Sequence, residues 1–317
     1  MRALICGVTG QDGAYLARYL LRAGYEVFGT SRDAQMRAPA NLAQLGIADR
    51  VRLLSMASND FRSVLQVLDK VRPDEIYNLA GQSSVALSFE QPVETLESLA
   101  VGTLNLLESL RFMGLKSRFY SAGSSESFGD TGDAAANEET PFRPRSPYAV
   151  AKATAFWEVA NYREAYGLFA CTGILFNHES PLRPERFVTQ KIVRAAVRIA
   201  KGSGERLGLG NLDVGRDWGY APEYVEAMWM MLQQDVPDDF VIATGTSNTL
   251  QDFVATAFAQ VGLDWKAHVD IDTGLLRPSD LKLSRANPSK ANKQLGWVAK
   301  SDMNAIIARM IAGLKAE

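Results

Sequence analysis

The sequence has few cysteines, no long apolar run and almost no net charge. Its only cysteines, Cys6 and Cys171, lie in apolar segments without a C-x-x-C spacing, which argues against a disulfide framework and a zinc site. We therefore expect a cytoplasmic protein without a bound metal. The longest stretches that lack Asp, Glu, Lys and Arg, residues 76–89 and 165–178, are shorter than the ~18 residues that a membrane span needs.

Charge of one sign is also scarce, because Lys and Arg total 34 and Asp and Glu total 36, for a net charge of −2. A chain so close to neutrality has no basic surface for nucleic acid or an anionic membrane, so neither is an expected partner. The phosphates of a small ligand must then be bound by a few placed side chains. With 47% hydrophobic and 22% charged residues over 317 positions, the composition predicts a globular protein with two domains or one large unit and a lobe.

Short apolar runs alternate with longer amphipathic segments through the first half of the chain. This alternation is typical of βαβ units and predicts an α/β fold with a doubly wound parallel sheet of the Rossmann type. The expected strands are residues 3–8, 25–29, 51–54, 75–79, 118–122 and 169–175, and the expected helices are residues 14–23, 61–71, 96–113 and 149–166.

After residue 176 the pattern changes, because prolines and glycines surround a single expected helix at 188–201. Segments 223–234 and 240–244 could return to the main sheet, and the tail mixes helices with a short strand near Val269. We expect a dinucleotide-binding domain and a smaller, discontinuous α/β lobe that binds the substrate. These comprise residues 1–175 plus 212–244, and residues 176–211 plus 245–317, respectively.

A glycine-rich segment lies between the first expected strand and the first expected helix. In this position glycines let the backbone approach a pyrophosphate at the helix N-terminus, so the segment predicts a dinucleotide site. Its expected cofactor contacts are Gly7, Thr9, Gly10, Gln11, Asp12 and Gly13.

Two residues of opposite charge, Arg32 and Asp33, follow the second expected strand. An acidic residue here would bind a ribose hydroxyl of NAD, whereas an arginine would bind the 2′-phosphate of NADP. The pair therefore leaves both cofactors open.

Tyr148 and Lys152 stand four residues apart on an expected helix, so their side chains share one face. Lys152 and an oxidised nicotinamide, both positive, would favour the phenolate of Tyr148, whose ordinary pKa is ~10, and let it act as a base. Ser124 and Glu126 follow the fifth expected strand, at the carboxyl edge where ligands of this fold bind. We expect Ser124 to hold the sugar hydroxyl that is oxidised. Glu126 would supply proton chemistry that a simple dehydrogenase does not require.

These residues and the stretches between them resemble the extended short-chain dehydrogenase/reductase family, and within it the GDP-mannose 4,6-dehydratases. The resemblance covers essentially the whole chain and is carried by GVTGQDGAYL, IYNLAGQSS, RPRSPYAVAK, NHESPLR and RDWG. It implies a lyase of nucleotide-sugar metabolism and deoxyhexose biosynthesis. Such an enzyme dehydrates GDP-mannose, or a close GDP-sugar, to GDP-4-keto-6-deoxymannose with NADP in a redox-neutral cycle. The resemblance also implies a homodimer or homotetramer.

The resemblance assigns roles by position. Tyr148 would be the base for the C4 hydroxyl, with Lys152 as its partner and Ser124 in place of the family's usual threonine. Glu126 would take the C5 proton and assist loss of the C6 hydroxyl. Further cofactor contacts would be Leu79, Ala80, Gln82, Tyr148, Lys152, His178 and Arg183. Substrate contacts would be Ser83, Ser125, Asn177, Lys191, Arg216 and Arg277, the two arginines being suited to the diphosphate.

Several positions depart from the dehydratase pattern. Asp33 stands where a second arginine is usual, and Ser55 stands where an aspartate is expected near the adenine, so NAD remains an alternative to NADP. Gln190 replaces an arginine, and the segments GSSESFG and FVTQ resemble the related GDP-4-keto-6-deoxymannose reductases. A reductase, or a GDP-sugar 4-dehydrogenase, is therefore the alternative activity. A non-catalytic dinucleotide-binding scaffold is a third hypothesis, which the complete set of acid and base residues disfavours.

Overall fold

The computed structural model describes residues 1–34, 39–275 and 279–315. Over these residues the chain builds a seven-stranded parallel sheet in the order β10-β6-β5-β4-β1-β2-β3. Six of its strands are those predicted, and β10 is a segment that we expected could return to the sheet, so the predicted doubly wound α/β fold is confirmed. The strands are β1 (Arg2–Cys6), β2 (Glu26–Ser31), β3 (Arg52–Ser55), β4 (Glu75–Asn78), β5 (Arg118–Ser124), β6 (Ala170–Leu175) and β10 (Phe240–Ile242).

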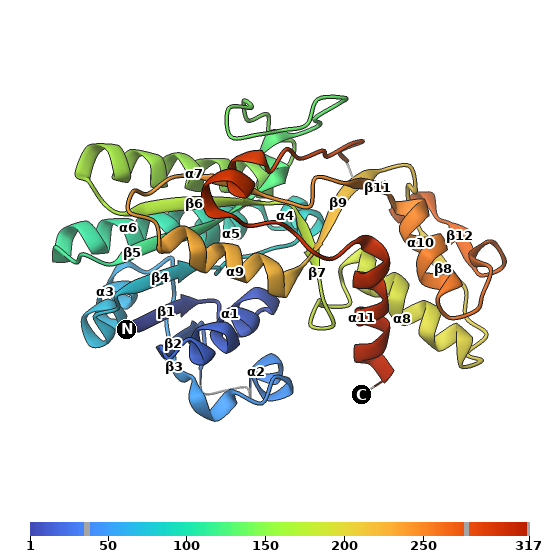
Figure 1. Cartoon of the computed structure of the whole chain (residues 1–317), viewed down its shortest axis with the longest axis horizontal. Coiled ribbons are helices and arrows are strands. Elements are labelled where there is room, and N and C mark those ends of the chain that lie inside the picture. The colour runs from blue at the N-terminus through green and yellow to red at the C-terminus, as the bar shows by residue number, and fades with distance from the viewer. Residues whose placement is uncertain (35–38, 276–278, 316–317) are drawn as a thin grey trace.

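Helices cover both faces of this sheet (Figure 1). On one face α1 (Gln11–Arg22) packs against α9 (Ala221–Leu232). On the other face lie α3 (Phe61–Val71), α6 (Gly102–Met113) and α7 (Pro147–Tyr166), whose apolar side chains form a second core with the strands. The strand order reverses direction between β1 and β4, and the crevice beyond the carboxyl ends of these strands is where this architecture binds ligands.

Local signals explain where the helices begin and end. Helix α3 has the predicted bounds because Asp60 accepts a hydrogen bond from the backbone N–H of Ser63 and caps the helix. Helix α7 begins at Pro147, two residues before the predicted start. The Ser146 hydroxyl accepts from the N–H of Ala149 at 3.1 Å, and proline suits the first helical position.

The predicted helix 96–113 is part of a longer helical run. It consists of α4 (Val85–Glu90), α5 (Pro92–Leu96), a π-helical turn (Glu97–Val101) and α6. Pro92 starts α5 for the same reason that Pro147 starts α7. A continuous apolar pattern therefore located the run but missed its N-terminal part.

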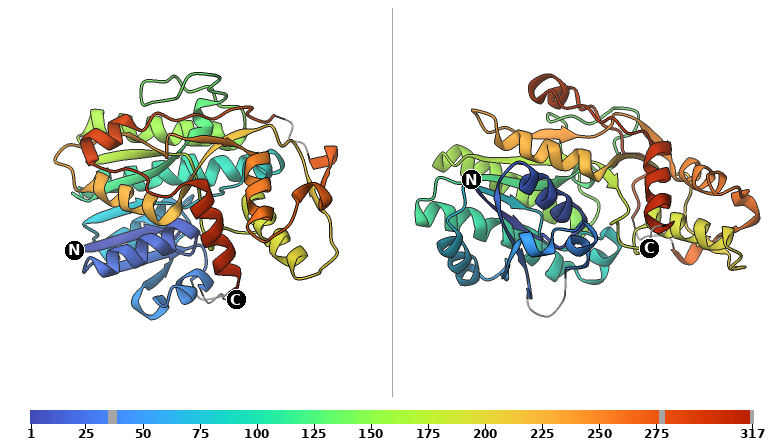
Figure 2. Two further views of the ribbon diagram at one scale, coloured as in Figure 1. Left: turned by 45° about the vertical axis from the view of Figure 1, so that its right-hand side comes forward. Right: turned by 60° about the horizontal axis from the view of Figure 1, so that its bottom comes forward.

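A lobe beside the main sheet is built from two small sheets and three helices (Figure 2). Strand β9 pairs with β7 and β11, and β8 pairs with β12, the strand predicted near Val269. The helices enclose an apolar core that includes Ile192, Phe253 and Met310. The strands are β7 (Asn177–Glu179), β8 (Leu207–Leu209), β9 (Gly215–Tyr220), β11 (Ser247–Thr249) and β12 (Val269–Ile271), and the helices are α8 (Val188–Ala200), α10 (Leu250–Ala259) and α11 (Met303–Lys315).

The division of the chain into two domains at the predicted boundaries stays a prediction. Among the described residues, no helix is long and apolar enough to span a membrane. A short helix, α2 (Ala40–Gln44), packs against α1 after the gap in the described residues.

Candidate active site

The three glycines after β1 have different environments, and these match the three demands of a dinucleotide-binding turn. Gly7 has φ +83°, and a Cβ there would lie 2.9 Å from the carbonyl oxygen of Leu79. At Gly13 a Cβ would lie 2.4 Å from the carbonyl oxygen of Gly7, so α1 packs tightly on the turn. At Gly10 the nearest atom would be 3.4 Å away, which leaves the approach to the helix N-terminus open. Tight turn, close ligand approach and helix packing are the roles that such glycines serve, so the segment fits a pyrophosphate.

One residue that stabilises the turn was not predicted from the sequence. Asn41, on α2, donates from Nδ2 to the carbonyl oxygen of Thr9 at 2.8 Å. Leu79 and Ala80 touch the other side of the turn, because their backbone atoms are nearest to the position of a Cβ on Gly7. Thr9, Leu79 and Ala80 are thus brought together with the glycines, and their contact with a cofactor stays a prediction.

Side chains at the start of α1 are hydrogen-bonded to β7 and the residue after it. The amide Nε2 of Gln11 donates to the carbonyl oxygen of His178 at 3.2 Å, and the Ser180 hydroxyl donates to Oε1 of Gln11 at 2.7 Å. The His178 ring nitrogen Nε2 lies 2.9 Å from Oδ2 of Asp12. These contacts join segments more than 160 residues apart and tie the cofactor turn to the lobe.

The ring of His178 has a hydrogen-bond acceptor at each nitrogen, since Nδ1 is 2.7 Å from the carbonyl oxygen of Phe176 and Nε2 faces Asp12. Only an imidazolium can donate to both acceptors. Burial opposes the charge, but the Asp12 carboxylate raises the pKa of His178 above its ordinary value. Burial likewise acts against the charge of Asp12, whose pKa His178 and Arg183 lower. The ring of Tyr224 stacks on the imidazole with 4.6 Å between the ring centres, so the imidazole has contacts at both nitrogens and on one face.

The four predicted catalytic residues meet at the carboxyl end of β5. Ser124 is the last residue of that strand, and Ser125 and Glu126 begin the single turn that follows it. The Ser124 hydroxyl accepts from the N–H of Glu126 at 3.3 Å, which fixes the direction of this turn. Tyr148 and Lys152 lie in the first turns of α7, which packs on β5 and on the turn. Ser124 and Ser125 are buried, whereas Glu126, Tyr148 and Lys152 are half-buried.

Lys152 lies beside the ring of Tyr148, and burial shifts the pKa of both side chains. Lys152 donates from Nζ to the carbonyl oxygen of Ala122 at 2.6 Å, and Nζ is 5.9 Å from the centre of the Tyr148 ring. Burial lowers the pKa of Lys152 to about 8. Burial raises the pKa of Tyr148 to about 12, against a lowering effect of hydrogen bonding to Ser124. The phenol therefore needs further positive charge beside it before it can act as a base near neutral pH.

The segment after β4 places two more of the predicted contacts. Gln82 has its N–H 3.3 Å from the Ser98 hydroxyl, and its Nε2 donates to the carbonyl oxygen of Ser84 at 2.8 Å. The Ser83 hydroxyl accepts from Arg186 at 3.5 Å. These bonds fold the segment back on itself at the edge of the crevice.

Arg183, a predicted cofactor contact, lies in the turn after β7. Its guanidinium stacks 3.7 Å from the centre of the Phe187 ring, and Nε is 3.2 Å from Oε2 of Glu179. The Glu179 carboxylate also accepts from the Thr189 hydroxyl at 2.7 Å. The guanidinium is therefore held between an aromatic face and a buried carboxylate.

At the end of β2, Arg32 forms an ion pair that the sequence did not predict. Its Nη1 lies 3.2 Å from Oε1 of Glu94 on α5, and Asp33 follows it in the chain. The Ser55 hydroxyl at the end of the neighbouring strand β3 accepts from the N–H of Ala34 at 3.1 Å. The arginine and aspartate are thus positioned where the cofactor ribose is expected.

The residues predicted for the nucleotide-sugar lie mostly on the lobe. Asn177 begins β7, which runs parallel to β9, and Arg216 lies on β9. The buried Arg216 donates to the carbonyl oxygen of Gly215 at 2.8 Å and lies 3.2 Å from Oδ1 of Asp280. Lys191, on α8, donates from Nζ to the carbonyl oxygen of Gly208 at 2.8 Å.

Arg277, the other arginine predicted for the diphosphate, lies outside the described residues. Within residues 1–34, 39–275 and 279–315, no group of acidic, histidine or cysteine side chains could hold a metal ion. Both cysteines are buried and unpaired.

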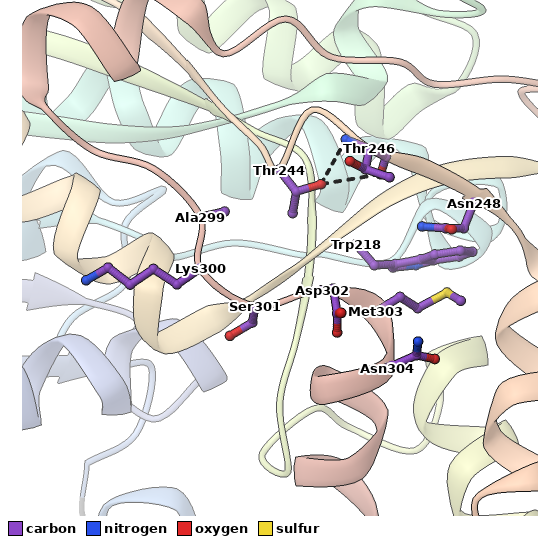
Figure 3. Close-up of a pocket in the computed structure, with 10 residues that line it drawn as sticks. All are labelled: Trp218, Thr244, Thr246, Asn248, Ala299, Lys300, Ser301, Asp302, Met303 and Asn304. Atoms are coloured by element: carbon purple, nitrogen blue, oxygen red, sulfur yellow. Dashed lines mark hydrogen bonds between the residues drawn. The ribbon is translucent and has the colours of Figure 1, made fainter.

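A cavity of about 290 Å³ lies between β9, the turn before β11 and the start of α11 (Figure 3). Trp218 and Asn248 line it from the strands, Thr244 and Thr246 from the turn, and Asp302 from the position just before α11. The Thr244 hydroxyl accepts from the N–H of Thr246 at 3.0 Å and holds the turn closed. None of the predicted site residues that the structure describes lines this cavity.

Comparisons with known proteins agree with these features. The family profile described as GDP-mannose 4,6 dehydratase matches residues 4–310. A GDP-mannose 4,6 dehydratase 1 of Arabidopsis thaliana is 46% identical over 319 residues, covering 98% of this chain and 88% of the relative. A GDP-mannose 4,6-dehydratase of Vibrio cholerae serotype O1 is 42% identical over 344 residues, covering 98% and 92%.

Solved structures share the fold. The crystal structure of DesIV, a dTDP-glucose 4,6-dehydratase from Streptomyces venezuelae with NAD and TYD bound, superposes with a TM-score of 0.90 at 22% identity. The match covers 100% of this chain and 98% of that one.

Proposed function

The chain belongs to the GDP-mannose 4,6-dehydratase family, and from this membership we propose that it converts GDP-mannose to GDP-4-keto-6-deoxymannose. The protein is then a nucleotide-sugar dehydratase, a lyase. It removes water across C5 and C6 of the hexose, and the reaction has no net redox change.

One observation carries the proposal at the level of side chains. A phenol, an ammonium, a hydroxyl and a carboxylate meet where β5 ends and α7 begins, beside a turn that fits a pyrophosphate. A dehydrogenase needs only the first three of these groups. The carboxylate of Glu126 adds an acid and base for elimination at the neighbouring carbon.

In this proposal Tyr148 takes the proton of the C4 hydroxyl, and Ser124 orients that hydroxyl by hydrogen bonding. Lys152 stabilises the phenolate, because a cation beside a phenol lowers the phenol's pKa. NAD or NADP, held by the glycine turn, would supply the hydride acceptor for C4 and the hydride donor for C6. The 4-keto group acidifies the C5 proton, which Glu126 removes. The same residue then donates a proton to the C6 hydroxyl, which leaves as water. When a hydride adds to C6, the proton that Tyr148 took from the C4 hydroxyl returns to C5, so Glu126 and Tyr148 both end the cycle in their starting state.

The expected cofactor is NADP, with NAD as the alternative that Asp33 leaves open. The glycine turn would hold its pyrophosphate and Arg32 a 2′-phosphate, which is why the residues present fit such a group. For the substrate, Arg216 on β9 and Lys191 on α8 supply positive charge suited to a diphosphate.

The test is direct. The purified protein is incubated with GDP-mannose and a catalytic amount of NADP, and the 4-keto product is followed by its absorbance in alkali or by mass. Product without net consumption of cofactor supports the dehydratase. In a second incubation, with the 4-keto sugar and reduced cofactor, consumption of one reduced cofactor per sugar would instead identify the reductase. GDP-mannose that binds but is never converted would refute the proposal.

We also propose a homodimer formed through the long helices. Apolar side chains are exposed on α5, the π-helical turn, α6 and α7, and the paired helices of two copies could bury them in a four-helix bundle. These exposed apolar side chains are Val93, Leu96, Val101, Leu104, Phe112, Val150 and Trp157. Sedimentation that shows a monomer at micromolar concentration would refute this proposal.

A cytoplasmic location stays a proposal, which the two unpaired cysteines support.

A further inference from the structure

The end of β2 carries more negative charge than a binding site for a 2′-phosphate requires. Arg32 is the side chain expected to bind that phosphate, and Asp33 follows it in the chain. Glu94 reaches this point from α5, with Oε1 3.2 Å from Nη1 of Arg32. The Arg32 guanidinium thus has one carboxylate in contact and a second acidic residue next to it in the chain, and a phosphate with its own negative charge would have to bind beside them.

We propose that Glu94 is a specificity-determining residue for the cofactor, which competes with the 2′-phosphate of NADP for the Arg32 guanidinium. It thereby narrows the preference for NADP over NAD. The inference rests on the proposed function in one respect, that the chain binds a nicotinamide dinucleotide.

The backbone around the ion pair is fixed, so the competition involves side chains alone. Ser31 pairs with Ser55 in the sheet, and the N–H of Met56 donates to the carbonyl oxygen of Ser31 at 2.9 Å. The N–H of Ala34 donates to the Ser55 hydroxyl at 3.1 Å. Arg32 therefore leaves the strand in one direction, and only its long side chain can move between Glu94 and a phosphate.

Geometry and exposure set the size of the effect. A guanidinium binds phosphate best through two parallel N–H groups, and Glu94 lies against one of its terminal nitrogens. The side chains of Arg32 and Glu94 are 87% and 52% exposed, so their pairing is weak and a phosphate can displace it. The carboxylate then lowers NADP affinity without excluding NADP. NAD has no 2′-phosphate for the guanidinium to bind, so the affinity for NAD should not depend on Glu94.

The experiment compares the dissociation constants of NADPH and NADH, measured by cofactor fluorescence, for the full chain and for Glu94→Gln. We expect NADPH to bind roughly fivefold more tightly to the variant and NADH to bind with unchanged affinity. Glu97→Gln is the matched control, because Glu97 is exposed three residues further along the same helical run. It removes the same charge at a position without this contact.

A second pair of variants tests the competition itself. Arg32→Gln should weaken NADPH binding, and adding Glu94→Gln to it should bring no recovery. The inference is wrong if Glu94→Gln leaves the ratio of the two affinities unchanged, if Glu97→Gln shifts that ratio equally, or if the gain persists without Arg32. Failure of both cofactors to bind the unaltered chain would instead refute the proposed function.

Discussion

Two alanine substitutions in the glycine turn should separate folding from cofactor binding. Gly13→Ala would place a Cβ 2.4 Å from the carbonyl oxygen of Gly7 and 2.6 Å from the Cα of Val8, about 1 Å closer than an ordinary contact of 3.4 Å. Both neighbours are backbone atoms that cannot rotate away. Helix α1 must therefore shift on the turn, and overpacking of this kind costs ~1–3 kcal/mol of unfolding free energy.

Gly10→Ala should do the opposite. Gly10 has φ −73° and ψ 173°, a backbone conformation that alanine adopts, and its Cβ would make only an ordinary contact at 3.4 Å. The unfolding free energy should change by less than ~1 kcal/mol. The new methyl group, however, occupies the space where the backbone approaches a pyrophosphate. Loss of one hydrogen bond to a charged phosphate costs ~1.5–3 kcal/mol, which weakens cofactor binding roughly 10- to 100-fold.

Urea unfolding without cofactor and fluorescence titration with NADPH measure the two effects. The reasoning requires that Gly13→Ala lowers the unfolding free energy and that Gly10→Ala lowers mainly the affinity. Normal NADPH affinity in Gly10→Ala would show that the pyrophosphate lies elsewhere. Equal destabilisation of both variants would show that the spacing of the glycines does not set their roles.

Three further substitutions test other parts of the structure. Tyr148→Phe should lower the turnover of GDP-mannose by ~10²–10⁴, as removal of a general base predicts, and turnover within tenfold of the unaltered chain would contradict the assignment. Asp239→Ala should lower the free energy of unfolding, measured in urea, by ~3–5 kcal/mol. The substitution removes the carboxylate that lies 2.7 Å from the Arg163 guanidinium, whose side chain is only 19% exposed. The contribution of His178 to stability is full below its unfolded pKa of ~6.5 and is lost as the pH rises through its higher folded pKa. The contribution of Asp12 to stability is full above its unfolded pKa of ~3.9 and is lost as the pH falls through its lower folded pKa. Urea midpoints from pH 6 to 9 should thus decline more steeply for the unaltered chain than for His178→Gln, and parallel curves would contradict this pairing.

Short-range patterns in the sequence predicted most of the fold. The alternation of apolar runs located β1 to β6, and the helical period located α7, although the predicted start at residue 149 left Tyr148 just outside it. The N-terminal extension of the α5–α6 run was missed although Pro92 marked it. A proline at the first helical position fixes a helix start more firmly than the apolar period does.

Contacts between distant segments could not be predicted in the same way. Asn41 binds Thr9 across 32 residues, and Arg32 meets Glu94 across 62 residues. Neither pair has a local pattern, because each depends on which strands become neighbours in the sheet. Tyr224 lies on α9, and its stacking on His178 follows only from the approach of α9 to β7.

The bonds from Gln11 and Asp12 to His178 and Ser180 give the glycine substitutions a second consequence. The start of α1 is hydrogen-bonded to β7 and the residue after it, and β7 pairs with β9. The position of the strands that carry the predicted substrate contacts therefore depends on the cofactor turn. A shift of α1 in Gly13→Ala should therefore also weaken the binding of GDP measured by calorimetry without cofactor. Gly10→Ala leaves α1 in place and should bind GDP normally. If both variants bind GDP as the unaltered chain does, the turn serves the cofactor alone, and the hydrogen bonds to β7 do not position the substrate.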